Sequence, residues 1–351
     1  MNRPWIIRVD ASKKVGAGHV MRCFAIADFL KSKKIDAIFF SRSPQIEKQT
    51  VNNGFEVRIL PESMTVADEL NLVRFLMVEK RIRVVLLDIK NYQTFHGTTK
   101  YDTYFDALKE LSLFLVSFED FKNYPYPSDI VIIPYFGAEK VKLREKANYK
   151  YLLGPKYFIF REEFVNVKSV TIRKVIGRIL VTMGGSDPTR ITLKVLNGLS
   201  DTELDIHVVV VIGGLSQISD KEIKDSLTSY RGQYSIVRDV SNIAELMLES
   251  DIAIINSGLT KYEVSAVGLP SLVISNNDYH SKLMSDFAKY KAVYHLGPTN
   301  KLSRAQISEA IACLANDYEL RCKMSERGKA LIDVNGMARI FAAIPREVLY
   351  A

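Results

Sequence analysis

One short stretch of the chain carries residue types suited to catalysis. In VGAGHVMRC, residues 15–23, two glycines and a histidine directly precede a predicted helix. Gly16 and Gly18 let the backbone approach a ligand closely. His19 would lie in the first helical turn, among amide groups that favour anions. An ordinary capping turn favours Ser, Asp or Asn there, so we interpret His19 as a catalytic residue rather than as a packing histidine at a helix start.

The apolar strand before this loop, WIIRVD, contains two charged residues near its end, Arg8 and Asp10, that could influence His19. An imidazole titrates near pH 6.5, at about the value that suits a general base taking a proton from water. Asp10 could orient the imidazole of His19 and raise its basicity. Arg8 either contacts the substrate or holds Asp10 in a purely structural pair, and the sequence leaves both alternatives open.

A second candidate loop, MGGSDPT at residues 183–189, lies between a predicted strand and a predicted helix. Gly184 and Gly185 could cradle a phosphate together with Ser186. The alternative is a well-capped helix, because Asp187–Pro188 offers an N-cap residue followed by proline at the first helical position.

A third loop, NSGLTKYE at residues 256–263, also leads from a strand into a helix. Ser257, Gly258 and Thr260 could offer hydroxyl and amide groups to a diphosphate at the helix N-terminus. Glu263 could take both hydroxyls of a ribose, as acidic residues do in dinucleotide folds. The alternative is that Glu263 only complements the helix dipole.

Composition excludes several other classes of protein. The 351 residues are 47% hydrophobic and 25% charged, with a net charge of +8, which describes a globular protein with a substantial core. No basic block, nucleic-acid module, dinucleotide fingerprint or Walker A loop is present. Three cysteines without a C-x-x-C pair, and five histidines without zinc spacing, indicate neither disulfides nor a metal site. The apolar runs are too short for a signal peptide or a membrane span, so we expect a cytoplasmic protein with at most weak contact to a membrane surface.

Short apolar strands alternate with amphipathic helices along the chain, which predicts α/β domains with parallel sheets. The alternation breaks after about residue 153 and restarts near 178. We therefore expect an N-terminal domain over 1–153 and a C-terminal domain over 154–335. The tail, 336–351, could pack back on the first domain. In such sheets, ligands bind beyond the carboxyl ends of the strands.

The stretch RVDASKKVGAGHVMRC resembles the opening of the nucleotide-sugar hydrolases of the pseudaminic acid pathway, and of related spore-coat polysaccharide proteins. The matching residues are Arg8, Asp10, Gly16, Gly18, His19 and Arg22. Three later segments are also similar in order: LGPKYFIFREEF, ILVTMGGSDPTRITLKVLNGL and SGLTKYEVSAVGLPSLVI. The last resembles a wider group that includes the lipid-linked N-acetylglucosaminyltransferase of cell-wall synthesis.

The resemblance implies two Rossmann-like domains facing a cleft, the glycosyltransferase B fold. It implies hydrolysis of a UDP-sugar without metal or cofactor, with His19 as the base for the attacking water. The C-terminal domain would hold the nucleotide, with Gly185 and Ser186 at the phosphates and Glu263 at the ribose.

Two loops depart from the family pattern. Asp88 is followed by IKNY where the family has a His-Tyr pair, and the stretch around Asn277, a further candidate for substrate binding, reads NNDYHS. The resemblance therefore implies a UDP-linked acylamino sugar as substrate, without specifying which one. A glycosyltransferase that uses a UDP-sugar donor, and a non-catalytic nucleotide-sugar binding protein, remain the alternatives.

Overall fold

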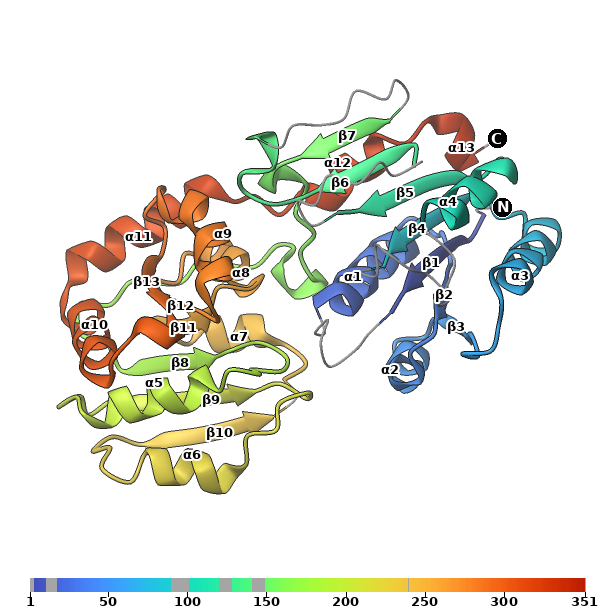
Figure 1. Ribbon diagram of the computed structural model, residues 1–351. Helices are drawn as coiled ribbons and strands as arrows, with labels where there is room; N and C mark the ends of the chain where they lie inside the picture. Colours follow the sequence, from blue (N-terminus) through green and yellow to red (C-terminus); the bar gives the residue numbers. More distant parts are fainter. Residues whose placement is uncertain are drawn as a thin grey trace. The chain divides into compact units, whose positions relative to one another are not determined.

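The chain folds into two compact units (Figure 1). The computed structural model describes residues 3–10, 18–89, 101–119, 128–140, 149–238 and 240–350. The first unit consists of residues 1–162 together with 335–351, and the second of residues 163–334. The sequence placed the first boundary slightly earlier, at 153, and assigned the C-terminal residues to a tail from 336.

The first unit contains a seven-stranded parallel sheet in the order β3-β2-β1-β4-β5-β6-β7. The inner strands are short apolar runs that are almost fully buried, as expected for a parallel sheet covered on both faces, whereas the edge strands β3 and β7 are partly exposed. The strands are β1 (Trp5–Val9), β2 (Ala37–Ser41), β3 (Glu56–Ile59), β4 (Val84–Asp88), β5 (Phe114–Phe118), β6 (Ile130–Ile133) and β7 (Lys150–Leu153).

Helices cover both faces of this sheet, and alternate residues of β1 serve the two faces. Trp5 and Ile7 pack with α1 and with the C-terminal helices, whereas Ile6 packs with α3 and α4. The helices of the unit are α1 (Gly18–Ser32), α2 (Glu47–Asn52), α3 (Val66–Glu79), α4 (Tyr101–Glu110), α12 (Gly336–Ala342) and α13 (Arg346–Tyr350), with short 3-10 turns at Pro44–Ile46, Ala138–Lys140 and Pro155–Tyr157.

The second unit repeats this plan with a six-stranded parallel sheet, in the order β10-β9-β8-β11-β12-β13. Its strands are β8 (Arg178–Thr182), β9 (His207–Ile212), β10 (Tyr234–Arg238), β11 (Ile252–Asn256), β12 (Ser271–Ser275) and β13 (Tyr294–Pro298). Its helices are α5 (Ile191–Ser200), α6 (Asp220–Ser226), α7 (Ile243–Leu248), α8 (Thr260–Val267), α9 (Asp278–Ala288), α10 (Arg304–Asn316) and α11 (Tyr318–Leu331). The predicted class, two α/β domains with parallel sheets, is confirmed.

In both sheets the strand order reverses beside the first strand of the unit. The reversal lies between β1 and β4 in the first unit, and between β8 and β11 in the second. At such a point the loops after the two central strands diverge to opposite faces and leave a crevice beyond the strand ends. The sheets therefore direct attention to the residues that follow β1, β4, β8 and β11.

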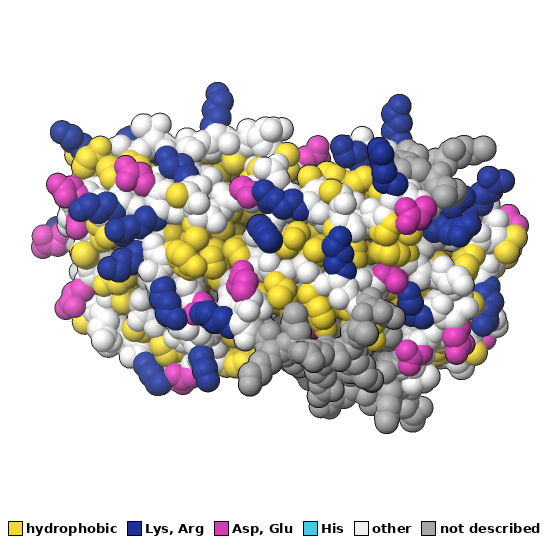
Figure 2. All heavy atoms as spheres, turned by 90° about the horizontal axis from the view of Figure 1, so that it is seen from above, with side chains coloured by type: hydrophobic (Ala, Val, Ile, Leu, Met, Phe, Trp, Pro, Cys, Tyr) yellow, Lys and Arg dark blue, Asp and Glu magenta, His cyan; other side chains and the backbone are white. Residues whose placement is uncertain are grey.

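Surface charge is dispersed on the one face of the molecule that Figure 2 draws. On the face drawn in Figure 2, Lys and Arg side chains lie scattered among acidic and apolar ones, so the net charge of +8 forms no single basic patch there. Within the described parts of the chain, no helix has both the length and the apolar character needed to span a bilayer.

A buried ion pair links β1 to the helix α3. The side chains of Arg8 and Glu69 are both fully buried, with 3.0 Å between Arg8 Nε and Glu69 Oε1. The hydroxyl of Tyr104 donates to the same carboxylate oxygen at 2.7 Å. Removing one member of a buried pair costs more than the pair contributes, because the other charge loses its compensation.

Replacing Glu69 by alanine should therefore lower the free energy of unfolding of the first unit by about 3–5 kcal/mol. Chemical denaturation followed by circular dichroism measures this. Glu79→Ala, at the exposed end of the same helix, is the matched control and should change stability by less than about 0.5 kcal/mol. Equal effects of the two substitutions would show that the buried pair is not important for stability.

Candidate functional site

His19 and Asp88 meet at the strand reversal of the first unit. His19 lies in the first turn of α1, and Asp88 is the last residue of β4. The His19 Nδ1 and Asp88 Oδ1 atoms are 2.5 Å apart, and the exposed fractions of the two residues are 8% and 2%. The histidine singled out by the sequence is thus held by a buried carboxylate that lies 69 residues away along the chain.

Arg22 completes the network one turn further along α1. Its Nε donates to Asp88 Oδ2 at 2.8 Å and its Nη2 to Asp88 Oδ1 at 2.7 Å, which is the two-pronged geometry that guanidinium groups favour with carboxylates. Its Nη1 donates to the hydroxyl of Tyr135 at 2.8 Å. The guanidinium also lies 4.2 Å from the ring centre of Phe118, at the end of β5.

Asp88 is ionised in this setting. Burial by itself would raise its pKa, but the Arg22 guanidinium, and then His19 with its hydrogen bond, hold the pKa well below the usual range of a carboxyl. The thiol of Cys23 faces the same carboxylate at 3.7 Å. Burial raises the pKa of that thiol, and Asp88 raises it further, so Cys23 is a packing residue rather than a nucleophile.

The carboxylate assigns the tautomer of His19. An ionised carboxylate can only accept, so the hydrogen on the imidazole lies on Nδ1. In the neutral ring the lone pair then lies on Nε2, and this atom can accept a proton. Arg22 Nη2 lies 2.9 Å from His19 Nδ1 because both groups donate to the same oxygen of Asp88. The arrangement is that of a general base oriented by a carboxylate.

The structure corrects the expectation for Asp10, directly after β1, and favours one of the two alternatives for Arg8. The carboxylate that contacts the imidazole is Asp88 and not Asp10. Asp10 instead forms an ion pair with Arg8, with 2.7 Å between Asp10 Oδ1 and Arg8 Nη1, and accepts from the backbone amide of Arg42, also at 2.7 Å. Arg8 is fully buried between Asp10 and Glu69, which favours its structural alternative over contact with substrate. Gly18 begins α1, whereas Gly16 lies outside the described residues.

In the second unit, the loop after β8 contains a turn and a helix cap. Gly184, Gly185 and Ser186 form the turn and are half-buried; Gly184 has φ of +76°, a backbone conformation that glycine adopts without strain. Asp187 accepts from the amides of Ile191 and Thr192 at 2.9 Å each. It therefore caps α5, as the alternative interpretation held, and the helix begins at Ile191 rather than at Pro188.

Asn256, which sequence reasoning did not single out, joins two of the candidate loops. It is the last residue of β11. Its Nδ2 donates to the carbonyl of Met183 at 2.5 Å, and its Oδ1 accepts from the amide of Gly258 at 3.0 Å. One amide side chain thus ties the loop after β8 to the loop after β11. A polar residue that ends an apolar strand is the signal that could have found both Asn256 and Asp88.

The third loop enters α8 without a side-chain cap. Leu259 occupies the N-cap position and makes no side-chain hydrogen bond there. Ser257 and Thr260 are half-buried, and Gly258 is exposed. Glu263 lies in the first turn of the helix and is half-buried. The structure brings these residues together with Asn256, and the uncapped helix start is a suitable place for an anion.

Asn277 has a local role in the structure. Its side chain accepts from the amide of His280 at 3.0 Å and so caps α9. The following residue, Asp278, pairs with Lys301. Of the IKNY stretch that departs from the family pattern after Asp88, Ile89 is buried, and residues 90–92 lie outside the described part of the chain.

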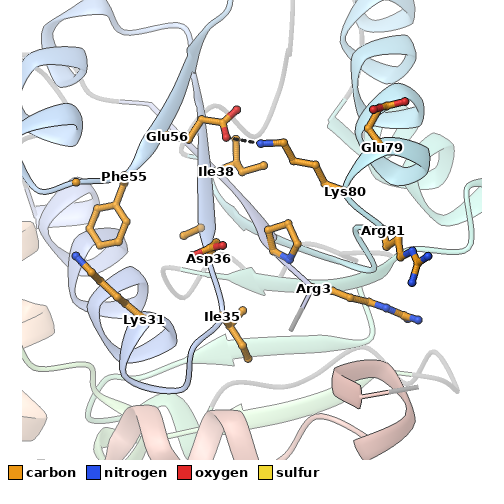
Figure 3. A pocket seen from close by; sticks show the side chains of 13 residues that line it. Arg3, Lys31, Ile35, Asp36, Ile38, Phe55, Glu56, Glu79, Lys80 and Arg81 are labelled. Carbon is orange, nitrogen blue, oxygen red and sulfur yellow. Dashed lines mark hydrogen bonds and ion pairs between the residues drawn. The ribbon is translucent and has the colours of Figure 1, made fainter. Parts of the chain in front are cut away.

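A cavity of about 640 Å³ lies at the opposite, amino ends of β1, β2 and β3 (Figure 3). Its walls carry charges of both signs, including the pair between Lys80 and Glu56. Lys31 and Lys80 stand at the C-terminal ends of α1 and α3, where cations complement the helix dipoles. We therefore assign these lysines a structural role. The candidate functional site remains the one at the carboxyl ends of the strands.

The chain is similar in sequence to two proteins of other organisms. No protein-family model matches it. It is 29% identical over 308 residues to an uncharacterized protein of Methanocaldococcus jannaschii, which covers 83% of this chain but only 60% of that protein's length. It is 26% identical over 345 residues to the spore coat polysaccharide biosynthesis protein SpsG of Bacillus subtilis, covering 96% of each. The resemblance to spore-coat polysaccharide proteins is thus confirmed.

Solved structures share the fold at low sequence identity. MurG of Acinetobacter baumannii has a TM-score of 0.70 at 11% identity, covering 97% of this chain and 99% of that one. A glycosyltransferase of Rickettsia africae has a TM-score of 0.66 at 14% identity, covering 99% of each. MnaA of S. aureus, solved with UDP, has a TM-score of 0.61 at 12% identity, covering 97% and 95%. The fold is that of the glycosyltransferase B enzymes.

Asp88→Asn keeps the shape of the side chain but removes its charge, so it should lower the free energy of unfolding by about 3–5 kcal/mol at pH 7. Because the pKa of Asp88 is depressed, its contribution is complete above the unfolded value of about 3.9 and is lost only as the pH falls below it. The deficit should therefore not diminish between pH 7 and about pH 5. Denaturation curves across this range measure it.

Asp106→Asn, on the exposed face of α4, is the matched control and should change stability by less than about 0.5 kcal/mol. A deficit for Asp88→Asn that already disappears near pH 5 would contradict the ionised, tightly paired state of Asp88.

Proposed function

We propose that this chain, a relative of the spore coat polysaccharide protein with a glycosyltransferase B fold, hydrolyses a UDP-linked acylamino sugar to UDP and free sugar. The observation that carries the proposal is the contact between His19 Nδ1 and Asp88. It orients an imidazole as a general base at a strand reversal, the place where open α/β sheets bind their ligands. The family resemblance of the loop before α1 supports the same assignment.

The proposed reaction needs one proton transfer and one bond exchange. His19 Nε2 takes a proton from water as the water oxygen bonds to the anomeric carbon. The bond between that carbon and the β-phosphate oxygen breaks, and UDP leaves with the electron pair. The imidazolium then returns its proton to solvent. Asp88 stabilises the imidazolium, and Arg22 keeps Asp88 ionised and in place.

The second unit would stabilise the leaving diphosphate. We assign the phosphates to the turn at Gly184, Gly185 and Ser186 and to the uncapped start of α8, because oriented amides stabilise developing negative charge. Glu263, one turn into α8, would accept from the ribose hydroxyls. MnaA, a protein with a similar fold, was solved in complex with UDP. This complex supports a uridine nucleotide as the ligand.

A second candidate function is transfer of the sugar to an acceptor hydroxyl. The likeness to glycosyltransferases, MurG among them, favours it. The same base would then deprotonate the acceptor instead of water. Incubation with a panel of UDP-acylamino sugars in ¹⁸O-labelled water, followed by mass spectrometry, separates the two. Labelled free sugar without any acceptor supports hydrolysis, whereas turnover only with an added acceptor fraction supports transfer. UDP binding without turnover under either condition would indicate a non-catalytic binding protein.

His19→Asn should reduce turnover by about 10²–10⁴-fold, the usual contribution of a positioned base. The affinity for UDP should change little, because the nucleotide is assigned to the second unit. Steady-state rates and calorimetry with UDP measure the two effects. His207→Asn, at the start of β9, is the matched control and should keep full activity. Near-normal turnover of the His19 variant, or loss of UDP binding with activity, would remove His19 from the role of base.

Glu263→Ala should weaken UDP binding by about 1–3 kcal/mol, the cost of losing hydrogen bonds to a charged acceptor. Calorimetry with UDP and with 2′-deoxy-UDP tests the assignment. The wild type should bind 2′-deoxy-UDP more weakly than UDP. The variant should bind the two nucleotides with similar affinity. Glu326→Ala, on the exposed face of α11, is the control and should leave the affinity unchanged. If the variant still distinguishes the two nucleotides, Glu263 does not bind the ribose.

A further inference from the structure

Through its side chain, Lys261 contacts the loop that leads into α8. It is the second residue of that helix and is half-buried. Its Nζ donates to the carbonyl of Ser257 at 3.1 Å and to the carbonyl of Gly258 at 2.9 Å. The same atom lies 4.8 Å from the ring centre of Tyr262 and 5.9 Å from that of Phe287, on α9. The ammonium is therefore enclosed by two carbonyl oxygens and two aromatic faces.

This cation lacks a counter-charge. No carboxylate of the described residues pairs with Lys261, whereas Arg178 and Asp286, two other half-buried charges of the second unit, each have a partner of opposite sign. The titratable group that faces it is His295 on β13, whose Nε2 lies 2.9 Å from Ser275 Oγ on β12. The pKa of His295 is lowered by burial and then by Lys261. His295 is therefore a neutral neighbour near pH 7 and offers Lys261 no counter-charge.

Burial lowers the pKa of Lys261 to about 7. A lysine with this pKa is only partly charged at neutral pH, because taking its charge out of water costs free energy that no neighbouring anion offsets. An anionic ligand nearby would restore the charge. The loop that Lys261 contacts is the one to which we assign the diphosphate, so such a ligand has a defined place.

The contacts also link the lysine to the amides of the loop. The carbonyl of Gly258 belongs to the same peptide unit as the N–H of Leu259. When the ammonium donates to this carbonyl, it polarises the peptide, and the N–H on the other side becomes a stronger donor. Protonation of Lys261 therefore strengthens the loop as an anion site, through the peptide as well as through its charge.

We propose that Lys261 supplies the positive charge beside the bound diphosphate, and that UDP binding adds a proton to it. This inference rests on the proposed function for the site but goes beyond it, because it couples nucleotide affinity to pH. By linkage, affinity for UDP should fall as the pH rises from 7 towards 9, since the free protein must then take a proton from solvent in order to bind.

Calorimetry of UDP binding at pH 8, in buffers of different ionisation enthalpy, measures the proton directly. At this pH the terminal phosphate of UDP, with a pKa of about 6, is already ionised and contributes little. A group with a pKa of about 7 in the free protein is mostly neutral at pH 8. Wild type should therefore take up about 0.5–0.9 proton for each UDP bound.

Two variants of Lys261 assign the proton. Lys261→Arg keeps the charge but stays protonated at every accessible pH, so it should bind UDP with no proton uptake. Lys261→Met should bind UDP about 10–100-fold more weakly, the effect of one charge-assisted hydrogen bond, and also without uptake. Lys282→Met, at an exposed position on α9, is the matched control and should behave as wild type.

The outcomes separate this inference from the function it rests on. UDP binding without proton uptake by the wild type would overturn the inference and leave the nucleotide site intact. Proton uptake that persists in Lys261→Arg would assign the proton to another group, such as the neighbouring His295. This result would also overturn the inference. Absence of any UDP binding by the wild type would overturn both.

Discussion

The charge of Asp88 is the constraint around which the site of the first unit is built. A carboxylate that is 2% exposed must have its charge compensated, and both of its compensating partners come from one helix. His19 and Arg22 are three residues apart, so they share a face of α1. Their contacts with one fixed carboxylate set the rotation of this helix against β4. The contacts of Asp88 with His19 and Arg22 therefore compensate the buried charge and also orient the imidazole.

The second unit solves the same topological problem with a neutral side chain. Asn256 ends β11 as Asp88 ends β4, and each residue reaches across the strand reversal to the segment after the unit's first strand. An amide can donate and accept at once, so Asn256 ties two backbone loops together without fixing a charge. A carboxylate instead organises cationic and titratable side chains. This difference suits the first unit to proton transfer and the second to binding.

Local patterns in the sequence were sufficient for the fold but not for the partner of His19. Buried parallel strands are continuous apolar runs, and several of the helices between them begin at capping residues of their own, so the class of fold follows from short segments. His19 was found because its residue type is unusual before a helix. Asp10 was chosen as its partner because it is near in sequence, whereas Asp88 is near in space. The pairing depends on β4 lying beside β1, and strand order is a long-range property that local periodicity does not encode.

Helix caps decide which loop of the second unit remains open to an anion. The first amides of α5 are already satisfied by Asp187, so that helix start has little left to offer a phosphate, and only the turn before it remains. The start of α8 has no such side-chain cap. Its first turn contains Glu263, and Lys261 donates to two carbonyls of the loop before it. A carboxylate that already accepts from the first amides of a helix competes with an anionic ligand, whereas a cation next to the loop favours one. The two helix starts look alike as glycine-containing loops in the sequence. They differ in whether a carboxylate already accepts from the first amides, and for this reason the start of α8 is the one proposed to bind an anion.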